Sequence, residues 1–368
     1  MKKRIILAVT NDIEGDQRLH KTALFLHKEG WEPVLVGRRL PDSTNMERPW
    51  KVKRFRLVFR KGPFFYLEYN FRLFFFLLFT PAVAFTANDL DTLPAVFMVS
   101  RLRRKPMVYD SHELFTGVPE LVDRPIVQGI WSLIERAVFP RLKLVITVNR
   151  SIADWYRRRY GVEVEVVRNV PLEHHEEQSG MDLPEAWSNH PVLIYQGAVN
   201  KGRGLEYMID AMVFLVEMRL CIAGGGDLLN EMKNRVNSKK LDDRVWFAGR
   251  VPPGQLRSLT RQATLGLSLE QDIGLNYRYA LPNKLFDYMH AGLPVLVSDL
   301  PEIRRVVESA GFGRIIGRFD PEYLAVCIRE MVNDPVQMKS WSEAARIASR
   351  QYTWEQEEGV LKRVYGKI

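Results

Sequence analysis

Six short apolar runs dominate residues 191–317 and limit the folds that this half of the chain can adopt. They read PVLIYQG, MRLCIAGGGD, RVWFAG, ATLGLSLE, PVLVSD and FGRIIG, and segments of helical spacing such as LEYMIDAM separate them. Continuous apolar strands that alternate with helices are typical of a parallel sheet covered on both faces. We therefore predict a doubly wound α/β domain in the second half of the chain.

The first half begins with the same pattern. Residues 4–9 (RIILAV) predict a strand, residues 10–16 a polar loop, and the next segment a helix that ends near Lys28, before the strand EPVLVG. This is the opening of a Rossmann-like sheet. No GxGxxG follows the first strand, so a dinucleotide-binding dehydrogenase is poorly supported.

Residues 172–191 make the best linker between the two halves, because they are polar and interrupted by Gly and Pro. We predict one domain over residues 1–172 and a second over 173–352. The linker's adjacent His174 and His175 suggest a metal site, but in a charge-rich linker such a pair is more often solvated. The two cysteines, Cys221 and Cys327, have no metal-binding spacing and fit a reducing cytosol.

Positive charge is concentrated in the first half. Residues 1–170 hold 29 Lys/Arg against 18 Asp/Glu, whereas residues 171–368 hold 24 against 26. This asymmetry indicates that the first half meets an anionic partner: a phosphate-bearing acceptor, an anionic membrane surface or nucleic acid. The segment 51–61, KVKRFRLVFRK, interleaves six basic residues with apolar ones. An amphipathic strand explains that pattern as well as nucleic-acid binding does, and given the surrounding α/β pattern we predict no nucleic-acid partner.

An aromatic segment covers residues 62–88. Its longest uncharged run, Leu73 to Asn88, has 16 residues and contains Pro81, which is too short for a membrane-spanning helix. We predict a buried helix followed by the strand AVAFTA. Shallow membrane contact is the second interpretation, because arginines flank the aromatic residues.

The strand PMVYD ends in a group of titratable residues. Open α/β sheets bind ligands at the carboxyl ends of their strands. His112 there is a candidate hydrogen-bond donor, general base or orienting group. A helix N-cap at Asp110 or Ser111 is the alternative. We favour a functional role for the group formed by Asp110, His112 and Glu113.

Residues 281–301, LPNKLFDYMHAGLPVLVSDLP, predict a short helix, a buried strand and a polar loop. The helix begins at Pro282 and ends at Gly292. Its free N-terminal amides and positive dipole end suit a phosphate, with sugar hydroxyls alongside. A merely solvated helix face is the alternative. The polar face consists of Asn283, Lys284 and Asp287.

Taken together and in order, four segments resemble motifs of the retaining glycosyltransferases of family 4 (glycosyl transferases group 1). They are YQGAVNKGRGLEYMIDA, LCIAGGGD, VWFAGRVP and LPNKLFDYMHAGLPVLVSD. The resemblance implies the GT-B fold, an α/β architecture of two facing Rossmann-like domains with parallel sheets and an interdomain cleft. It also implies that residues 353–368 form a last helix that packs back on the first domain.

In this family the second domain holds a nucleotide-sugar donor. By resemblance, Gly197 opens the loop that faces the donor phosphates. Arg203 falls at the place of the family's phosphate-binding lysine, with Lys201 a second candidate one register away. Asn283 and Lys284 are also assigned to the phosphates, and Arg203 and Lys284 to catalysis, because both can neutralise a leaving diphosphate.

The family's paired-acid motif places its second acid on Asp287, which is expected to hold the ribose hydroxyls. The motif's first acid would fall on Tyr279, which is not an acid. Glu270 and Asp272 are therefore the candidates to bind the hydroxyls of the donor sugar in its place. Arg250 and Val251 resemble the turn that binds the base.

In the first domain, His112 resembles the residue that approaches the donor sugar, and Asp110 and Glu113 accompany it. Gly15 and Asp16 would lie in the loop near the reaction centre, on the acceptor side.

We predict a hexosyltransferase-type enzyme that moves a sugar from a UDP- or GDP-sugar to a glycan or lipid-linked acceptor with retention, without a metal or other cofactor. The resemblance suggests a role in cell-surface polysaccharide or lipopolysaccharide biosynthesis. We expect a cytoplasmic protein, peripheral to the inner face of the membrane. The alternatives are a GT-B nucleotide-sugar epimerase and a non-catalytic nucleotide-sugar-binding protein.

Overall fold

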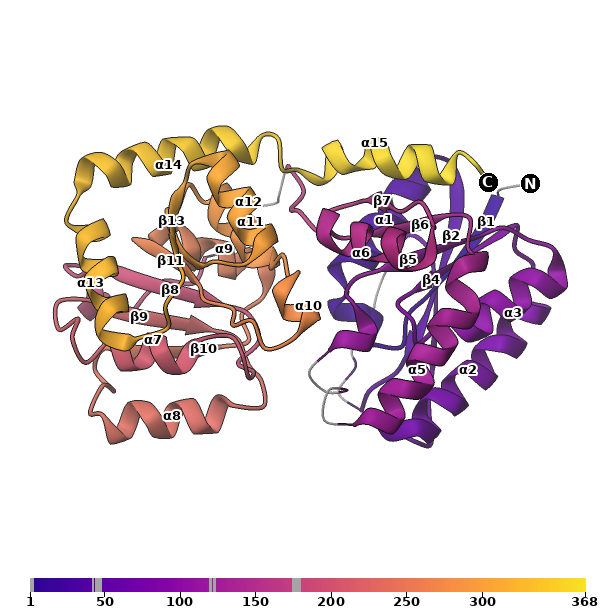
Figure 1. Ribbon diagram of the computed structural model, residues 1–368, viewed down its shortest axis with the longest axis horizontal. Coiled ribbons are helices and arrows are strands. Elements are labelled where there is room, and N and C mark those ends of the chain that lie inside the picture. Colours follow the sequence, from indigo (N-terminus) through magenta and orange to yellow (C-terminus); the bar gives the residue numbers. More distant parts are fainter. Residues whose placement is uncertain (1–2, 42, 44–47, 119–120, 122–123, 174–179) are drawn as a thin grey trace. The chain divides into compact units, whose positions relative to one another are not determined.

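The computed structural model describes residues 3–41, 43, 48–118, 121, 124–173 and 180–368 (Figure 1). His174 and His175 therefore lie outside the described residues. The chain forms two compact units. Unit 1 comprises residues 1–169 and 357–368, and unit 2 comprises residues 170–356.

A seven-stranded parallel sheet forms the centre of unit 1, with the order β3-β2-β1-β4-β5-β6-β7. The apolar run at residues 5–8 is buried in β1, an inner strand of the sheet, as its composition predicts. The edge strand β7 has only two residues, Glu165 and Val166. The strands are β1 (Lys3–Ala8), β2 (Trp31–Arg38), β3 (Lys51–Phe55), β4 (Ala84–Asn88), β5 (Met107–Ser111), β6 (Val145–Thr147) and β7 (Glu165–Val166).

Helices of unit 1 connect these strands, and α2, α3 and α5 lie side by side (Figure 1). The predicted buried helix over the aromatic segment is wrong in one respect. It forms as α2, but only Phe65, Tyr69, Leu73 and Leu77 are buried, and several other aromatic side chains face solvent. The helices are α1 (Gln17–Lys28), α2 (Gly62–Phe79), α3 (Leu93–Arg103), α5 (Pro125–Val138) and α6 (Arg150–Tyr160).

Unit 2 contains the six predicted strands as one parallel sheet, ordered β10-β9-β8-β11-β12-β13. Two parallel α/β sheets therefore confirm the predicted fold class. The strands are β8 (Val192–Gln196), β9 (Arg219–Ala223), β10 (Val245–Gly249), β11 (Leu265–Ser268), β12 (Val295–Ser298) and β13 (Gly313–Ile316). The helices are α7 (Leu205–Ala211), α8 (Leu229–Ser238), α9 (Pro253–Gln262), α10 (Leu275–Arg278), α11 (Asn283–His290), α12 (Pro301–Ala310), α13 (Pro321–Val332) and α14 (Pro335–Ser349).

The segment 281–301 forms the predicted helix α11 and strand β12. Tyr288 fixes α11 against the sheet, because its buried hydroxyl donates to the carbonyl of Ile194 and accepts from the amide of Gln196. The Tyr288 ring packs directly on Gly266. A side chain at that position would clash, because its Cβ would lie 2.6 Å from the ring. The helix ends before Gly292, which has the left-handed φ of 67°. The polar face of α11 is thus held rigidly at the edge of the sheet.

The last helix, α15 (Trp354–Tyr365), starts in unit 2 and ends in unit 1. Within unit 1, Glu357 is buried and accepts hydrogen bonds from the backbone N–H and the side chain of Arg168. The hydroxyl of Tyr365 lies 3.2 Å from the Thr86 hydroxyl on β4. Among the helices in the described part of the chain, none has the length and apolar character needed to cross a membrane.

Candidate active site

A buried ion pair organises the carboxyl edge of the sheet in unit 1. Arg18, in the first turn of α1, donates to both carboxylate oxygens of Asp110 at the end of β5 and to the carbonyl of Val167. The two side chains are 3% and 1% exposed. Burial opposes ionisation of Asp110, but Arg18 and His112 outweigh it and lower its pKa to about 2. The pair therefore holds a charged carboxylate in place beneath His112.

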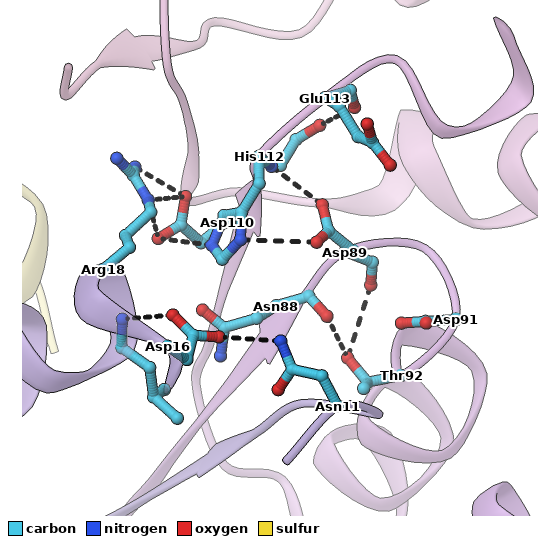
Figure 2. Close-up of polar contacts among 12 residues, drawn as sticks. Asn11, Asp16, Arg18, Asn88, Asp89, Asp91, Thr92, Asp110, His112 and Glu113 are labelled. Atoms are coloured by element: carbon cyan, nitrogen blue, oxygen red, sulfur yellow. Dashed lines mark hydrogen bonds and ion pairs between the residues drawn. The ribbon is translucent and has the colours of Figure 1, made fainter. Parts of the chain in front are cut away.

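His112 lies between two carboxylates (Figure 2). Its Nδ1 is 3.3 Å from an oxygen of Asp89, and its Nε2 is 3.5 Å from an oxygen of Asp110. Burial alone would lower the pKa of the imidazole, but the two carboxylates raise it to about 9. The ring is protonated at neutral pH, so the geometry favours the role of donor or orienting cation over that of general base.

Asp89 and Asp91, which follow β4, belong to the same group although the sequence interpretation missed them. Asp89 has a left-handed φ of 61° and accepts from the backbone N–H of His112 at 2.8 Å. Burial, followed by the charge of Asp89, raises the pKa of Asp91 to about 7, and its carboxylate accepts from the hydroxyl of Thr10. Polar residues directly after the strand AVAFTA give the same signal that singled out Asp110, and could have identified this pair.

The predicted loop residues lie around this group. Asp16 caps α1 by accepting from the amide of Leu19 at 2.9 Å, and it also accepts from Asn11 (Figure 2). Gly15 is exposed at the end of a short 3-10 turn. Glu113 follows His112, and its carbonyl accepts from Ser111. Titratable side chains from three segments thus meet at this edge.

The corresponding edge of unit 2 carries a buried charge cluster. Glu270, which follows β11, is fully buried and accepts from the Ser268 hydroxyl at 2.7 Å. The Lys284 Nζ on α11 lies 2.7 Å from the Glu270 carboxylate, and a guanidinium nitrogen of Arg203 lies 3.7 Å from it. Two cations and one carboxylate leave a net charge of +1, which suits an anionic ligand.

Aromatic rings support both cations. The Lys284 ammonium is 4.0 Å from the centroid of the Tyr195 ring, and the Arg203 guanidinium is 5.0 Å from that of Tyr277. Burial lowers the pKa of Lys284 to about 8, although Glu270 opposes this effect. A bound anion would favour the charged form of the lysine, so ligand binding and protonation of Lys284 are linked.

Two glycine loops pack backbone against backbone beside this cluster. A Cβ at Gly224, after β9, would lie 1.8 Å from the carbonyl oxygen of Gly197, after β8. A Cβ at Gly197 would lie 3.9 Å from the Cε of Lys284. The side chain of Arg250, after β10, approaches Gly225 in the second loop, and Val251 follows it. Only a glycine at position 224 permits this close approach of the two loops.

Asp287 on α11 is fixed by a chain of hydrogen bonds. It accepts from the Gln196 side chain at 2.7 Å, and the Gln196 oxygen accepts from the hydroxyl of Thr260 at 2.8 Å. Gln196 is buried at the end of β8. Asn283, at the start of α11, is exposed, and Lys201 lies on an exposed turn whose carbonyl accepts from Tyr277. The edge therefore combines two cations with a positioned carboxylate.

Two family models match successive parts of the chain. "Glycosyltransferase Family 4" matches residues 17–171, and "Glycosyl transferases group 1" matches residues 184–348. Together they cover β2 to β7 of unit 1 and the whole sheet of unit 2. The chain belongs to glycosyltransferase family 4.

Two curated proteins resemble this family-4 glycosyltransferase. Alpha-D-kanosaminyltransferase of Streptomyces kanamyceticus is 20% identical over 289 residues, which are 74% of this chain and 73% of that protein. Phosphatidyl-myo-inositol mannosyltransferase of Mycobacterium leprae (strain TN) is 26% identical over 178 residues, which are 45% of this chain and 43% of that protein.

Solved structures share the fold over nearly the whole chain. Sucrose-phosphate synthase from Thermosynechococcus elongatus has a TM-score of 0.80 at 16% identity and covers 100% of this chain and 99% of its own. WaaG, a glycosyltransferase involved in lipopolysaccharide biosynthesis, has a TM-score of 0.75 at 15% identity, covering 98% and 100%. Anabaena Alr3699/HepE in complex with UDP-glucose has a TM-score of 0.73 at 14% identity, covering 99% and 100%. The chain has the GT-B fold and is a glycosyltransferase enzyme.

Within this glycosyltransferase, the geometry shows which acid lies near the two cations of unit 2, Arg203 and Lys284. Tyr279, where the motif spacing places the first acid, ends the turn after α10. Asp272 forms an exposed ion pair with Arg278 at 2.8 Å. Glu270 contacts Lys284 directly, which favours it as the substitute acid, although its full burial makes it a partner of the cations rather than an exposed ligand for a sugar.

Proposed function

We propose that this family-4 enzyme transfers a hexose-type sugar with retention from a UDP- or GDP-sugar to a hydroxyl of a glycan or lipid-linked acceptor, in cell-surface polysaccharide or lipopolysaccharide synthesis. The observation that carries the donor half of this proposal is the cluster of Arg203, Lys284 and Glu270 beside the Gly197 loop. Such a cluster suits a diphosphate, because two cations supported by aromatic rings can contact its oxygens.

The transfer breaks the bond between the anomeric carbon and the diphosphate oxygen, and forms a bond from the same carbon to the acceptor oxygen. Negative charge grows on the leaving diphosphate, where Arg203, Lys284 and the α11 amide at Asn283 would stabilise it without a metal. The acceptor proton passes to the departing phosphate oxygen, so attack occurs on the same face and the anomeric configuration is kept.

We assign Asp287 to the ribose hydroxyls and Arg250 with Val251 to the base, with Lys201 near the phosphates. Gln196 and Thr260 hold the Asp287 carboxylate in one orientation, which supports a fixed hydrogen-bonding role. Glu270 would act through Lys284 and Arg203, by keeping both side chains in place.

The unit 1 edge would serve the sugar and the acceptor. A protonated His112, held by Asp89 and Asp110, presents a positive charge next to solvent, with its side chain 21% exposed. We assign it to a sugar oxygen, and the loop with Gly15 and Asp16 to the acceptor. The names of the M. leprae mannosyltransferase and of WaaG support lipid-linked or lipopolysaccharide acceptors.

The test is incubation with UDP- and GDP-sugars and a pool of glycan and lipid-linked acceptors, with nucleoside diphosphate release and the anomeric proton of the product measured by NMR. An α-linked product from an α-linked donor supports the proposal. An inverted product overturns retention. Epimerised sugar without transfer identifies an epimerase instead, and donor binding without diphosphate release in any acceptor pool identifies a binding protein.

A further inference from the structure

The exposed side of α2 carries a continuous row of apolar side chains. Phe71 and Phe75 contact one another with ring centroids 4.9 Å apart, and Phe75 and Phe79 stack at 6.3 Å. Single exposed apolar residues are ordinary, but a row along a whole helix marks a docking surface. The α2 row consists of Phe64, Leu67, Phe71, Phe75 and Phe79, which are between 42% and 76% exposed.

The loop before α2 extends this row and is held in place. The carboxylate of Glu68 accepts from the backbone amides of Val58 and Phe59, each at 2.9 Å. Val58 is 75% exposed and Phe59 is 47% exposed. Phe59 also packs on Phe64 with centroids 5.4 Å apart. The exposure of these apolar side chains is therefore a fixed feature of the fold.

A cavity lined by arginines lies beside the start of α2. It has a volume of about 330 Å³, and Phe59 and Phe65 form part of its wall. Its cations come from the end of β2 and from the segments that follow β2 and β3, and no carboxylate is found among the described residues that line it. The four arginines are Arg38, Arg39, Arg56 and Arg60.

A second basic cavity lies toward the other end of α2. It has a volume of about 640 Å³ and lies at the end of α3. The end of α3 is held against the end of α2, because Arg103 donates to the carbonyls of Leu77 and Thr80 at 2.6 Å. The described lining again contains no acid. Its basic residues are Arg101, Arg104, Lys105, Arg141, Lys143 and Lys367.

We propose that unit 1 docks on an anionic lipid bilayer through the surface formed by the α2 row and the two basic cavities. The α2 row would enter the headgroup region, and the two cavities would hold lipid phosphates. A bilayer offers both partners that the face needs, since apolar chains lie directly beneath a layer of phosphates. A second copy of the chain fits poorly, because a twofold contact through α2 would bring like-charged cavities toward one another. The proposal concerns surface binding and goes beyond the sugar transfer.

The test is flotation of the full chain with vesicles of phosphatidylcholine, with and without phosphatidylglycerol, at low and high salt. The first variant is Phe71→Ser/Phe75→Ser/Phe79→Ser, and the second is Arg56→Gln/Arg60→Gln. The control, Val336→Ser/Ile347→Ser, removes two apolar side chains that are at least 65% exposed from α14 in unit 2. Because all the substituted side chains are at the surface, thermal unfolding should change little in any variant.

Wild type and the control should float with anionic vesicles, and the triple variant should lose at least tenfold in partitioning. The arginine variant should lose about fivefold per residue, the equivalent of about 1 kcal/mol each. The proposal is overturned if wild type fails to float at low salt, or if neutral vesicles bind it equally well. It is also overturned if inorganic phosphate binds the arginine cavity while vesicles do not bind, or if the triple variant only dissociates a dimer.

Discussion

Removing the charge of Lys284 should affect both the stability of unit 2 and its binding of a nucleoside diphosphate. In Lys284→Gln the Glu270 carboxylate stays fully buried without its closest cation. Breaking a buried pair costs about 3–5 kcal/mol of unfolding free energy, and we expect about 3 kcal/mol, because Arg203 at 3.7 Å and Ser268 remain. A lost charge-assisted hydrogen bond to the diphosphate costs about 1.5–3 kcal/mol, which weakens UDP or GDP binding by about 10- to 150-fold.

The double variant Glu270→Gln/Lys284→Gln tells the two effects apart. It removes the buried carboxylate as well, so stability should return to within about 1 kcal/mol of wild type, whereas nucleotide affinity should stay low. Urea unfolding followed by tryptophan fluorescence measures stability, and isothermal titration measures affinity. Wild-type affinity in the double variant would refute a contact between Lys284 and the diphosphate, and wild-type stability in the single variant would refute a charged Glu270–Lys284 pair.

Unit 2 also supplies a matched control for this experiment. Asp210 pairs with Arg235 at 2.5 Å and with Lys239 at 3.3 Å, which is the same arrangement of one acid and two cations at a more exposed place. Lys239→Gln should cost less than about 1 kcal/mol of stability and leave nucleotide binding unchanged.

Three further outcomes are expected. Arg18→Met should destabilise unit 1 by about 3 kcal/mol, because the buried Asp110 carboxylate loses its closest cation and keeps His112 at 3.5 Å. Arg18→Met/Asp110→Asn should recover most of this loss in urea unfolding, and equal losses in the two variants would contradict the account. The pKa of His112 is raised from 6.5 to about 9, so its contribution to stability is complete below about pH 6.5 and disappears as the pH rises through 9. The destabilisation caused by His112→Gln should therefore shrink between pH 6 and pH 9.5, and a difference that does not change with pH would refute a charged ring. Asp287→Ala should weaken binding of UDP or GDP by about tenfold but spare binding of inorganic pyrophosphate, and parallel losses for both ligands would argue against a ribose contact.

The sequence predicted the two sheets because their strands are short, continuous and apolar. Strands β8 and β12 are fully buried, and such strands keep a local pattern that can be recognised without a structure. The helix α11 was also predictable, since Pro282 and Gly292 mark its ends.

Contacts between distant residues could not be predicted in the same way. Arg18 and Asp110 are 92 positions apart, and only the parallel order of β1, β4 and β5 brings them together. Glu270 stands 17 positions before Asp287, whereas the paired-acid motif has a fixed and shorter spacing that points to Tyr279 instead. The segment that contains α10 lies between Glu270 and Lys284 in the sequence. Despite this separation, the Glu270 carboxylate contacts the Lys284 ammonium.

The burial of α2 was predicted wrongly for a physical reason. Its apolar residues occur on all sides of the helix, and this composition does not distinguish a helix enclosed by protein from one with a face left for another apolar medium. The exposed row became recognisable only when the packing of α2 against α3 and the sheet was known.

The central claim is that the unit 2 edge binds the diphosphate of a nucleotide-sugar donor through Arg203 and Lys284. Isothermal titration of wild type and of Arg203→Ala/Lys284→Gln with UDP and uridine, and with GDP and guanosine, tests it most directly. We predict that one diphosphate binds wild type at least tenfold more tightly than its nucleoside, and that this ratio falls to near one in the variant. An unchanged ratio in the variant would contradict the claim.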